Sequence, residues 1–134
     1  MARSKNDSLE TRTGRAIRSI DDKRRILIPS DFLLSMEIEK KSEVCIYYPG
    51  GDYLDILPIS IYKQGLRKIG ELPPHDEERL AFAKEHYKSK IDGIGRLRLP
   101  YVEGTKLGEI RKGSKLEIIA NIDRITINLN PKEK

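Results

Sequence analysis

The feature that most constrains the fold of this chain is an internal repeat with an offset of 71 residues. Segment 20–29 (IDDKRRILIP) returns at 91–100 (IDGIGRLRLP) with four identical positions of ten and two exchanges of Ile for Leu. The same offset pairs segment 52–56 (DYLDI) with segment 123–127 (DRITI). Self-similarity at a fixed period indicates one structural unit that occurs more than once. The sequence therefore predicts two copies of a half-domain within 134 residues.

Both halves are expected to contain the same order of elements. The first half predicts a strand over 14–20, a tight turn, a strand over 25–28, a helix over 30–36 and a hairpin of strands 43–48 and 53–57. The second half predicts strands 88–91 and 96–99, a weak helix toward Ile110, and strands 115–120 and 124–129. These patterns predict an α+β fold, mainly β, made of a pseudo-twofold pair of β-β-α-β-β halves.

A helical connector is expected between the halves, with helices over 58–69 and 75–88. The second helix follows two prolines, carries acidic residues in its first turn and ends in lysines, as the helix dipole favours. Leu80, Ala83 and Tyr87 are expected to form its buried face. The chain thus divides into a flexible basic arm (1–13), a first half (14–57), a connector (58–87), a second half (88–130) and a tail (131–134).

Composition argues against several classes of protein. Cys45 is the only cysteine, so no disulfide and no cysteine-based zinc site is expected. The two histidines, His75 and His86, lie beside no motif for nucleophilic or phosphate chemistry, so we expect no enzyme activity, cofactor, metal or small-molecule substrate. No apolar run is long enough to span a membrane. A cytoplasmic, nucleoid-associated protein with no membrane partner is expected.

The net charge of +5 is concentrated near the N-terminus. Residues 1–30 contain eight basic and four acidic side chains, a local excess of four. Such a basic excess is typical of a protein that binds a polyanion, either nucleic acid or an anionic membrane surface. A solvated tail without a partner is the alternative interpretation.

The repeated turn has the pattern Asp-x-x-x-Arg and precedes an apolar strand and a proline. One interpretation is structural: Asp21 and Asp92 cap their turns and pair with Arg25 and Arg96. The other is that the turns contact DNA, because arginines on a rigid turn suit phosphate contact and bidentate pairing with guanine. The candidate DNA-binding residues are those of the turns and strands, namely Lys23, Arg24, Arg25, Arg96 and Arg98, together with Arg15 and Arg18 of the preceding strand.

The paired turns resemble a known family of DNA-binding proteins. Gly14-x6-Asp21-x-Lys23-x-Arg25-x3-Pro29, followed by Asp92-x2-Gly95-Arg96-x3-Pro100, is similar to the paired signature of the MraZ family within the AbrB-like superfamily. The resemblance covers about residues 14–129. It implies an AbrB-like swapped-hairpin β-barrel, a ring-like homo-oligomer, and binding of double-stranded DNA at short direct repeats in the promoter of the division and cell-wall gene cluster. It places DNA contacts on Lys23, Arg25 and Arg96.

Two questions stay open at this point. Arg24 stands where the family usually has glycine, which predicts either an altered turn or an additional contact. The second turn contains Gly93, Ile94 and Gly95 and therefore no supporting charge, so Arg96 is expected to contribute less than Arg25. A non-specific nucleoid-binding protein and an AbrB-type antitoxin remain alternative functions, although the tail after Asn130 is short for wrapping a toxin.

Overall fold

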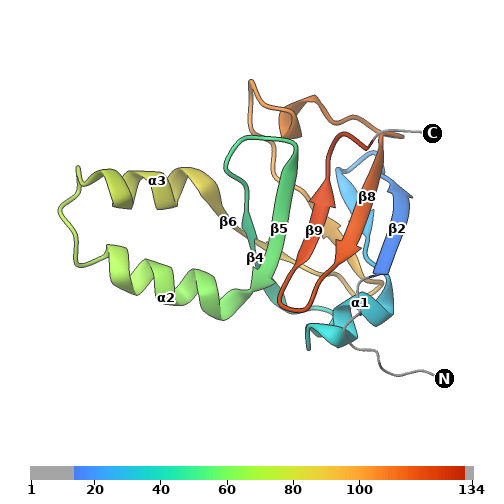
Figure 1. Ribbon diagram of the computed structural model, residues 1–134, viewed down its shortest axis with the longest axis horizontal. Coiled ribbons are helices and arrows are strands. Elements are labelled where there is room, and N and C mark those ends of the chain that lie inside the picture. The colour runs from blue at the N-terminus through green and yellow to red at the C-terminus, as the bar shows by residue number, and fades with distance from the viewer. Residues whose placement is uncertain (1–13, 132–134) are drawn as a thin grey trace.

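The chain folds into two antiparallel sheets and a helical hairpin (Figure 1). The computed structural model describes residues 14–131, so the predicted arm (1–13) and the last three residues lie outside the described residues. The strands are β2 (Gly14–Ser19), β3 (Arg25–Leu27), β4 (Glu43–Tyr47), β5 (Tyr53–Pro58), β6 (His86–Lys90), β7 (Arg96–Arg98), β8 (Lys115–Ala120) and β9 (Ile125–Asn128). The helices are α1 (Ser30–Ser35), α2 (Ile59–Ile69) and α3 (Glu77–Glu85), with one 3-10 turn, η1 (Leu107–Glu109).

The larger sheet interleaves strands from the two halves. Its order is β2-β8-β9-β5-β4-β6, so β2 of the first half pairs with β8 of the second, and β6 of the second pairs with β4 of the first. The predicted α+β, mainly β class is confirmed. Within residues 14–131 the strands do not close into a barrel, because β2 and β6 are the two edges of the sheet and β3 and β7 form a separate pair.

Strand register confirms the repeat. Asp55 of β5 lies opposite Thr126 of β9, and Ile26 of β3 lies opposite Leu97 of β7. The residues of each pair are 71 positions apart, so each residue faces its own counterpart from the other half. A pseudo-twofold axis therefore passes through the β5–β9 pair and the β3–β7 pair.

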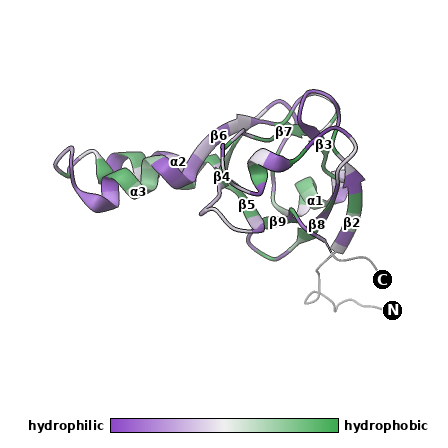
Figure 2. Ribbon diagram, turned by 90° about the horizontal axis from the view of Figure 1, so that it is seen from above, coloured by the Kyte–Doolittle hydropathy of each residue, from purple (hydrophilic) through white to green (hydrophobic). Residues whose placement is uncertain are grey.

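The core is aliphatic and lies between the two sheets. Figure 2 shows β3 and β7 on one side of the molecule and β5, β9 and β8 on the other, and Figure 1 shows α1 at the lower end of β8 and β2. The strands alternate, so every second side chain points inward. The buried residues include Ile26 and Leu97 from the small sheet and Val44, Ile46, Ile56, Ile118 and Ile127 from the large one.

Helices α2 and α3 form a hairpin that projects from one end of the large sheet (Figure 1). The prediction of a helix extending to residue 88 was wrong: α3 ends at Glu85, because the chain then becomes extended and pairs with β4. The predicted buried face was wrong as well, since Leu80 is 55% exposed, Ala83 is exposed and Tyr87 lies in β6. The side chain that joins the helices is Phe82, which packs directly on Gly65.

The second half lacks the helix that the repeat predicts. Between β7 and β8 only the three residues of η1 are helical, so the expectation of two β-β-α-β-β halves was wrong for the second copy. Gly104 has a φ of 79°, which an α-helix does not contain. Gly108 lies so close to the chain that a Cβ there would collide with the carbonyl oxygen of Val102. The backbone of this segment is irregular.

Candidate nucleic-acid interface

The two repeated turns meet in the small sheet, which we call the β3–β7 ribbon. Arg25 lies opposite Arg98, and Leu27 lies opposite Arg96. Because Ile26 and Leu97 are fully buried, the flanking residues of both strands point to the outer face. The ribbon therefore presents four side chains together on its outer face: Arg25, Leu27, Arg96 and Arg98.

The outer face of the ribbon is not covered by the rest of the described chain. Figure 2 shows β3 and β7 at one edge of the molecule, while the α2–α3 hairpin projects in a different direction. Leu27 is 40% exposed, so the ribbon offers an apolar side chain to solvent among its arginines.

The first turn is held together by one carboxylate. Oδ1 of Asp21 accepts hydrogen bonds from the backbone N–H groups of Lys23 and Arg25, each at 2.8 Å. Its Oδ2 accepts from Nε of Arg25, also at 2.8 Å. Desolvation raises the pKa of Asp21, but the hydrogen bonds from Arg25 and Lys23 outweigh it, so the pKa lies below its ordinary value.

The second turn repeats this arrangement with an additional bond. Oδ1 of Asp92 accepts from the backbone N–H groups of Ile94, Gly95 and Arg96 at 3.0, 3.0 and 2.8 Å. Its Oδ2 accepts from Nε of Arg96 at 2.8 Å. The backbone bond from Arg96 is the largest cause of a pKa lowered to about 2 for Asp92. Both aspartates thus have the structural role that the turn pattern predicts.

Pairing with aspartate leaves part of each arginine available. Arg25 and Arg96 each use only Nε, and among residues 14–131 their Nη atoms have no hydrogen-bond partner. The side chains are 23% and 30% exposed. A guanidinium held at Nε has fewer rotamers to lose and still offers two Nη groups to a phosphate or a guanine edge. The structural interpretation and the DNA-binding interpretation are therefore compatible.

Arg24 points into the molecule and has no place on this surface. Its backbone φ is 62°, which turns its side chain toward the segment after β7. Four bonds to backbone carbonyls fix the guanidinium: Nε to Leu99 at 3.3 Å, Nη1 to Ile110 at 3.2 Å, and Nη2 to Pro100 at 2.6 Å and Leu107 at 3.0 Å. Desolvation lowers its pKa.

Sequence patterns did not reveal this role of Arg24. The residue sits in a run of three basic side chains, which favours a shared surface function. The only signal was the repeat itself, since Arg24 corresponds to Gly95, whose φ is also positive at 104°. A glycine position occupied by arginine indicates that the backbone turn is kept while the side chain has acquired a separate use.

The other predicted arginines lie away from the ribbon. Arg15 and Arg18 are three residues apart in β2, so they point to opposite faces of that strand. Arg15 is paired with Glu117 of β8 at 2.6 Å, and Nη1 of Arg18 donates to the carbonyl of Ile17 at 3.0 Å. Lys23, by contrast, is exposed at the tip of the first turn.

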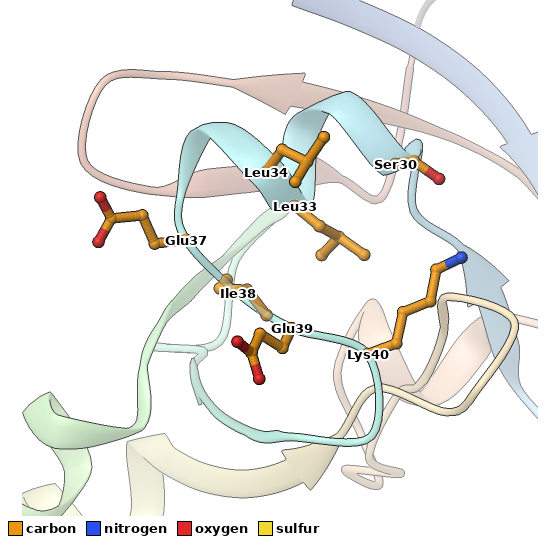
Figure 3. A pocket seen from close by; sticks show the side chains of 7 residues that line it. All are labelled: Ser30, Leu33, Leu34, Glu37, Ile38, Glu39 and Lys40. Atoms are coloured by element: carbon orange, nitrogen blue, oxygen red, sulfur yellow. The ribbon is translucent and has the colours of Figure 1, made fainter.

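A hollow of about 560 Å³ lies beside α1 (Figure 3). Leu33, Leu34 and Ile38 form its apolar lining, with Glu37, Glu39 and Lys40 at the rim. In Figure 3 the carboxylates of the two glutamates point outward from the hollow, away from Ser30, which also lines it.

The part of the chain that the structure describes contains no cluster of three or more side chains suited to hold a metal ion. None of the helices within residues 14–131 combines the length and apolar character that crossing a membrane requires. Compared with protein-family models and with curated proteins, the chain matches none of them.

Proposed function

We propose that this protein is a sequence-specific regulator that binds double-stranded DNA through the β3–β7 ribbon, as the resemblance to the MraZ family implies. The observation that carries the proposal is the meeting of both Asp-x-x-x-Arg turns in one exposed ribbon. Two segments 71 residues apart thereby place three arginines and one leucine on a single face. The proposed targets are short direct repeats in a promoter, as in that family.

A two-stranded ribbon fits the major groove of B-DNA, which is about 12 Å wide. In this arrangement the Nη atoms of Arg25 and Arg96 pair with guanine edges, while each Asp partner keeps its arginine in place. Leu27 is positioned to contact a thymine methyl group. Lys23, exposed at the turn, contacts phosphate and contributes affinity without sequence information.

For the fold we propose the AbrB-like swapped-hairpin arrangement. The exchange of strands supports it, because β2 pairs with β8 and β6 pairs with β4, each across the pseudo-twofold axis. In this proposal the ribbon belongs to both halves equally. Each half contributes only one of the two strands, so neither half alone forms the outer face of the β3–β7 ribbon.

We also propose that the chain assembles with itself into a ring. The α2–α3 hairpin supports this proposal, since it projects from the sheet and leaves Ile61, Leu66 and Leu80 between 41% and 55% exposed. Apolar side chains on a projecting hairpin are typical of a surface that another subunit covers. Light scattering at micromolar concentration is expected to give a mass of several subunits, and a stable monomer would contradict the assembly.

The decisive experiment selects DNA from a random pool with the purified protein and then measures binding to the selected duplex. Arg25→Ala is expected to weaken that binding by about 1–3 kcal/mol and to relax the preference at one base position. Lys23→Ala is expected to weaken binding to every duplex alike. The slope of the logarithm of the binding constant against the logarithm of the salt concentration should become less steep by about one unit. Lys63→Ala on α2, away from the ribbon, is the matched control and should leave binding unchanged in protein that light scattering shows to be assembled.

Two results would overturn the proposal in different ways. If Arg25→Ala keeps full affinity while the protein unfolds at a lower temperature, the arginine is structural only. If the selected pool shows no preferred sequence, and all duplexes compete equally, the protein is a non-specific nucleoid-binding protein.

A further inference from the structure

The second turn has basic neighbours that its own sequence does not reveal. Residues 93–95 of this turn carry no charge, whereas the first turn contains Lys23. The structure places two lysines of the first half, Lys40 and Lys41, directly beside the second turn. Both belong to the loop between α1 and β4, more than 50 residues away in the sequence.

The contacts of these lysines with the turn are close. Cε of Lys41 lies 3.3 Å from the position that a Cβ on Gly93 would occupy, and Cε of Lys40 lies 3.7 Å from that position on Gly95. The backbone N–H of Lys41 donates to the carbonyl of Ile91 at 2.7 Å, which fixes the loop against the start of the turn. The two glycines therefore leave room along which the lysine side chains lie.

The first turn has an equivalent neighbour from the second half. The backbone N–H of Gly113 donates to the carbonyl of Ile20 at 2.9 Å, as that of Lys41 does to Ile91. Lys112 therefore corresponds to Lys40, with an offset of 72 because the second half has one more residue between its turn and its hairpin. At each turn, then, the chain is bonded to a lysine-containing loop of the other half.

The charges of Lys40 and Lys41 are not neutralised nearby. Both residues are exposed, and among residues 14–131 neither has an ion-pair partner within 4.0 Å. In Figure 3 the carboxylates of Glu37 and Glu39 point away from the ammonium group of Lys40. Glu43, at the end of the same loop, pairs with Lys88 at 3.5 Å.

We propose that Lys40 and Lys41 bind DNA phosphates beside the second turn. These phosphates belong to the DNA backbone on one side of the groove, and those that Lys23 binds beside the first turn belong to the backbone on the other side. The turns lie at opposite ends of the ribbon, because β3 and β7 are antiparallel. Four residue steps separate the level of Arg24 from that of Gly95, which is about 14 Å of strand. This length is comparable to the groove width of about 12 Å, so lysines at both ends reach the two backbones while the ribbon lies between them.

The inference rests on the proposed function, and the test compares Lys40→Gln/Lys41→Gln with the wild-type protein, each with all 134 residues. We measure affinity for the selected duplex and for an unrelated duplex over a range of salt concentrations. The salt slope is the decrease in the logarithm of the binding constant per tenfold increase in salt concentration. Each lost phosphate contact is expected to reduce this slope by about 0.9, and such a reduction corresponds to about a fivefold loss of affinity at about 0.15 M salt. The double variant is therefore expected to lose about thirtyfold on both duplexes alike and to keep its preferred sequence.

Two further variants make the result specific. Lys40→Arg/Lys41→Arg keeps both charges and is expected to keep the salt slope. Lys63→Gln/Lys68→Gln removes two charges from α2, away from the ribbon, and is expected to keep the wild-type salt slope in protein that light scattering shows to be assembled. A thermal melt and light scattering establish that every variant is folded and assembled.

The outcomes separate this inference from the function on which it rests. If the Gln double variant retains the wild-type slope while Arg25→Ala and Arg96→Ala lose affinity, the lysines do not contact DNA and the proposed function stands. If the double variant loses affinity for only one duplex, the lysines read sequence, and the assignment to phosphate is wrong. If the wild-type protein binds no duplex, the proposed function itself fails.

Discussion

The two halves share one turn and differ in the segment after it. After the first turn the chain forms α1, whose backbone bonds close within the helix, such as Met36 N–H to Phe32 oxygen at 3.3 Å. After the second turn the chain is irregular, and carbonyls of Leu99, Pro100, Leu107 and Ile110 accept bonds from Arg24. In a helix, carbonyls such as these would accept from backbone N–H groups of the same segment. In the second half the guanidinium of Arg24, from the first half, is their donor instead.

The difference is concentrated at one pair of equivalent positions. Arg24 and Gly95 both have positive φ, so the backbone of the turn is the same in the two halves. Of these two residues only Arg24 has a side chain. That side chain binds the irregular segment, which occurs only in the second half. We infer that the arginine and the missing helix depend on each other.

The largest expected effect comes from making the first turn like the second. Arg24→Gly relieves a positive φ but removes the side-chain donor of four carbonyls, of which that of Leu107 keeps a backbone bond from Ile110 at 3.4 Å. We therefore expect a net loss of about 2–4 kcal/mol in the free energy of unfolding. Urea unfolding measures it. Arg24→Lys is the control for charge: because an ammonium cannot reproduce the planar fork, it should recover less than half of the loss.

A wild-type free energy of unfolding in Arg24→Gly would contradict the interdependence of the two halves. Amide hydrogen exchange sharpens the same test. Faster exchange is expected for residues 99–110, with little change in α1.

The second largest effect distinguishes an irregular segment from a helix. In a helix, Gly108→Ala would stabilise the protein by about 1 kcal/mol. Here the added Cβ would meet the carbonyl oxygen of Val102, so we expect destabilisation by about 1–3 kcal/mol. A thermal melt of the variant gives the sign, and a raised melting temperature would show that the segment is helical in solution.

A smaller effect is expected at the seam where the two halves face each other. Asp55 accepts from Thr126, its own counterpart, at 2.7 Å and pairs with Arg124 at 3.1 Å. Asp55→Asn keeps an acceptor for the threonine but removes the ion pair, and we expect a loss of about 0.5–1 kcal/mol by urea unfolding. Asp123→Asn, which removes a more exposed partner of the same arginine, should have less effect. Equal losses of unfolding free energy in the two variants would show that the ion pair of Asp55 stabilises the protein no more than the exposed pair of Asp123.

The smallest effect concerns pH and compares the two aspartates. The pKa of Asp92 is lowered to about 2 from an ordinary value of 3.8, so its contribution to stability is complete above about pH 4 and is lost as the pH falls toward 2. Asp92→Asn should therefore be less stable than the wild type at neutral pH, and the difference should shrink between about pH 4 and pH 2.

Asp21→Asn should behave in the same direction with a smaller difference, since Asp21 accepts two backbone bonds where Asp92 accepts three. Urea unfolding at a series of pH values measures both variants. A wild-type stability that rises as the pH falls from about 4 to 2 would contradict the assignment.

The sequence predicted those parts of the fold that local pattern determines. The 71-residue offset reappears in the pairing of Ile26 with Leu97, and the boundaries of β8 are those that alternation predicts. The end of α3 was missed because pairing with β4, distant in the sequence, overrides the helical preference of residues 86–88. Pattern alone cannot reveal such tertiary competition.

The candidate site was predicted in part for the same reason. The bonds of Arg25 and Arg96 to their aspartates are local, four residues apart, and follow from the turn pattern. The inward position of Arg24 and the nearness of Lys40 to Gly95 depend on contacts between distant segments. Local pattern reveals the charge of these residues but not the direction in which they point.

The exchange of strands between halves has a consequence for how such a chain can change. In a symmetric dimer of identical half-size chains every substitution occurs twice, so an arginine at one turn would also appear at the other. Here the α2–α3 hairpin joins both halves covalently, and a substitution occurs once. Because of that linkage, Arg24 and Gly95 can differ. The first half can likewise contain the helix α1 while the second half contains an irregular segment at the equivalent position. A fold with the symmetry of a dimer has thereby acquired two ends of the β3–β7 ribbon that differ from each other. In the proposed function, this difference sets the orientation in which a direct repeat is bound.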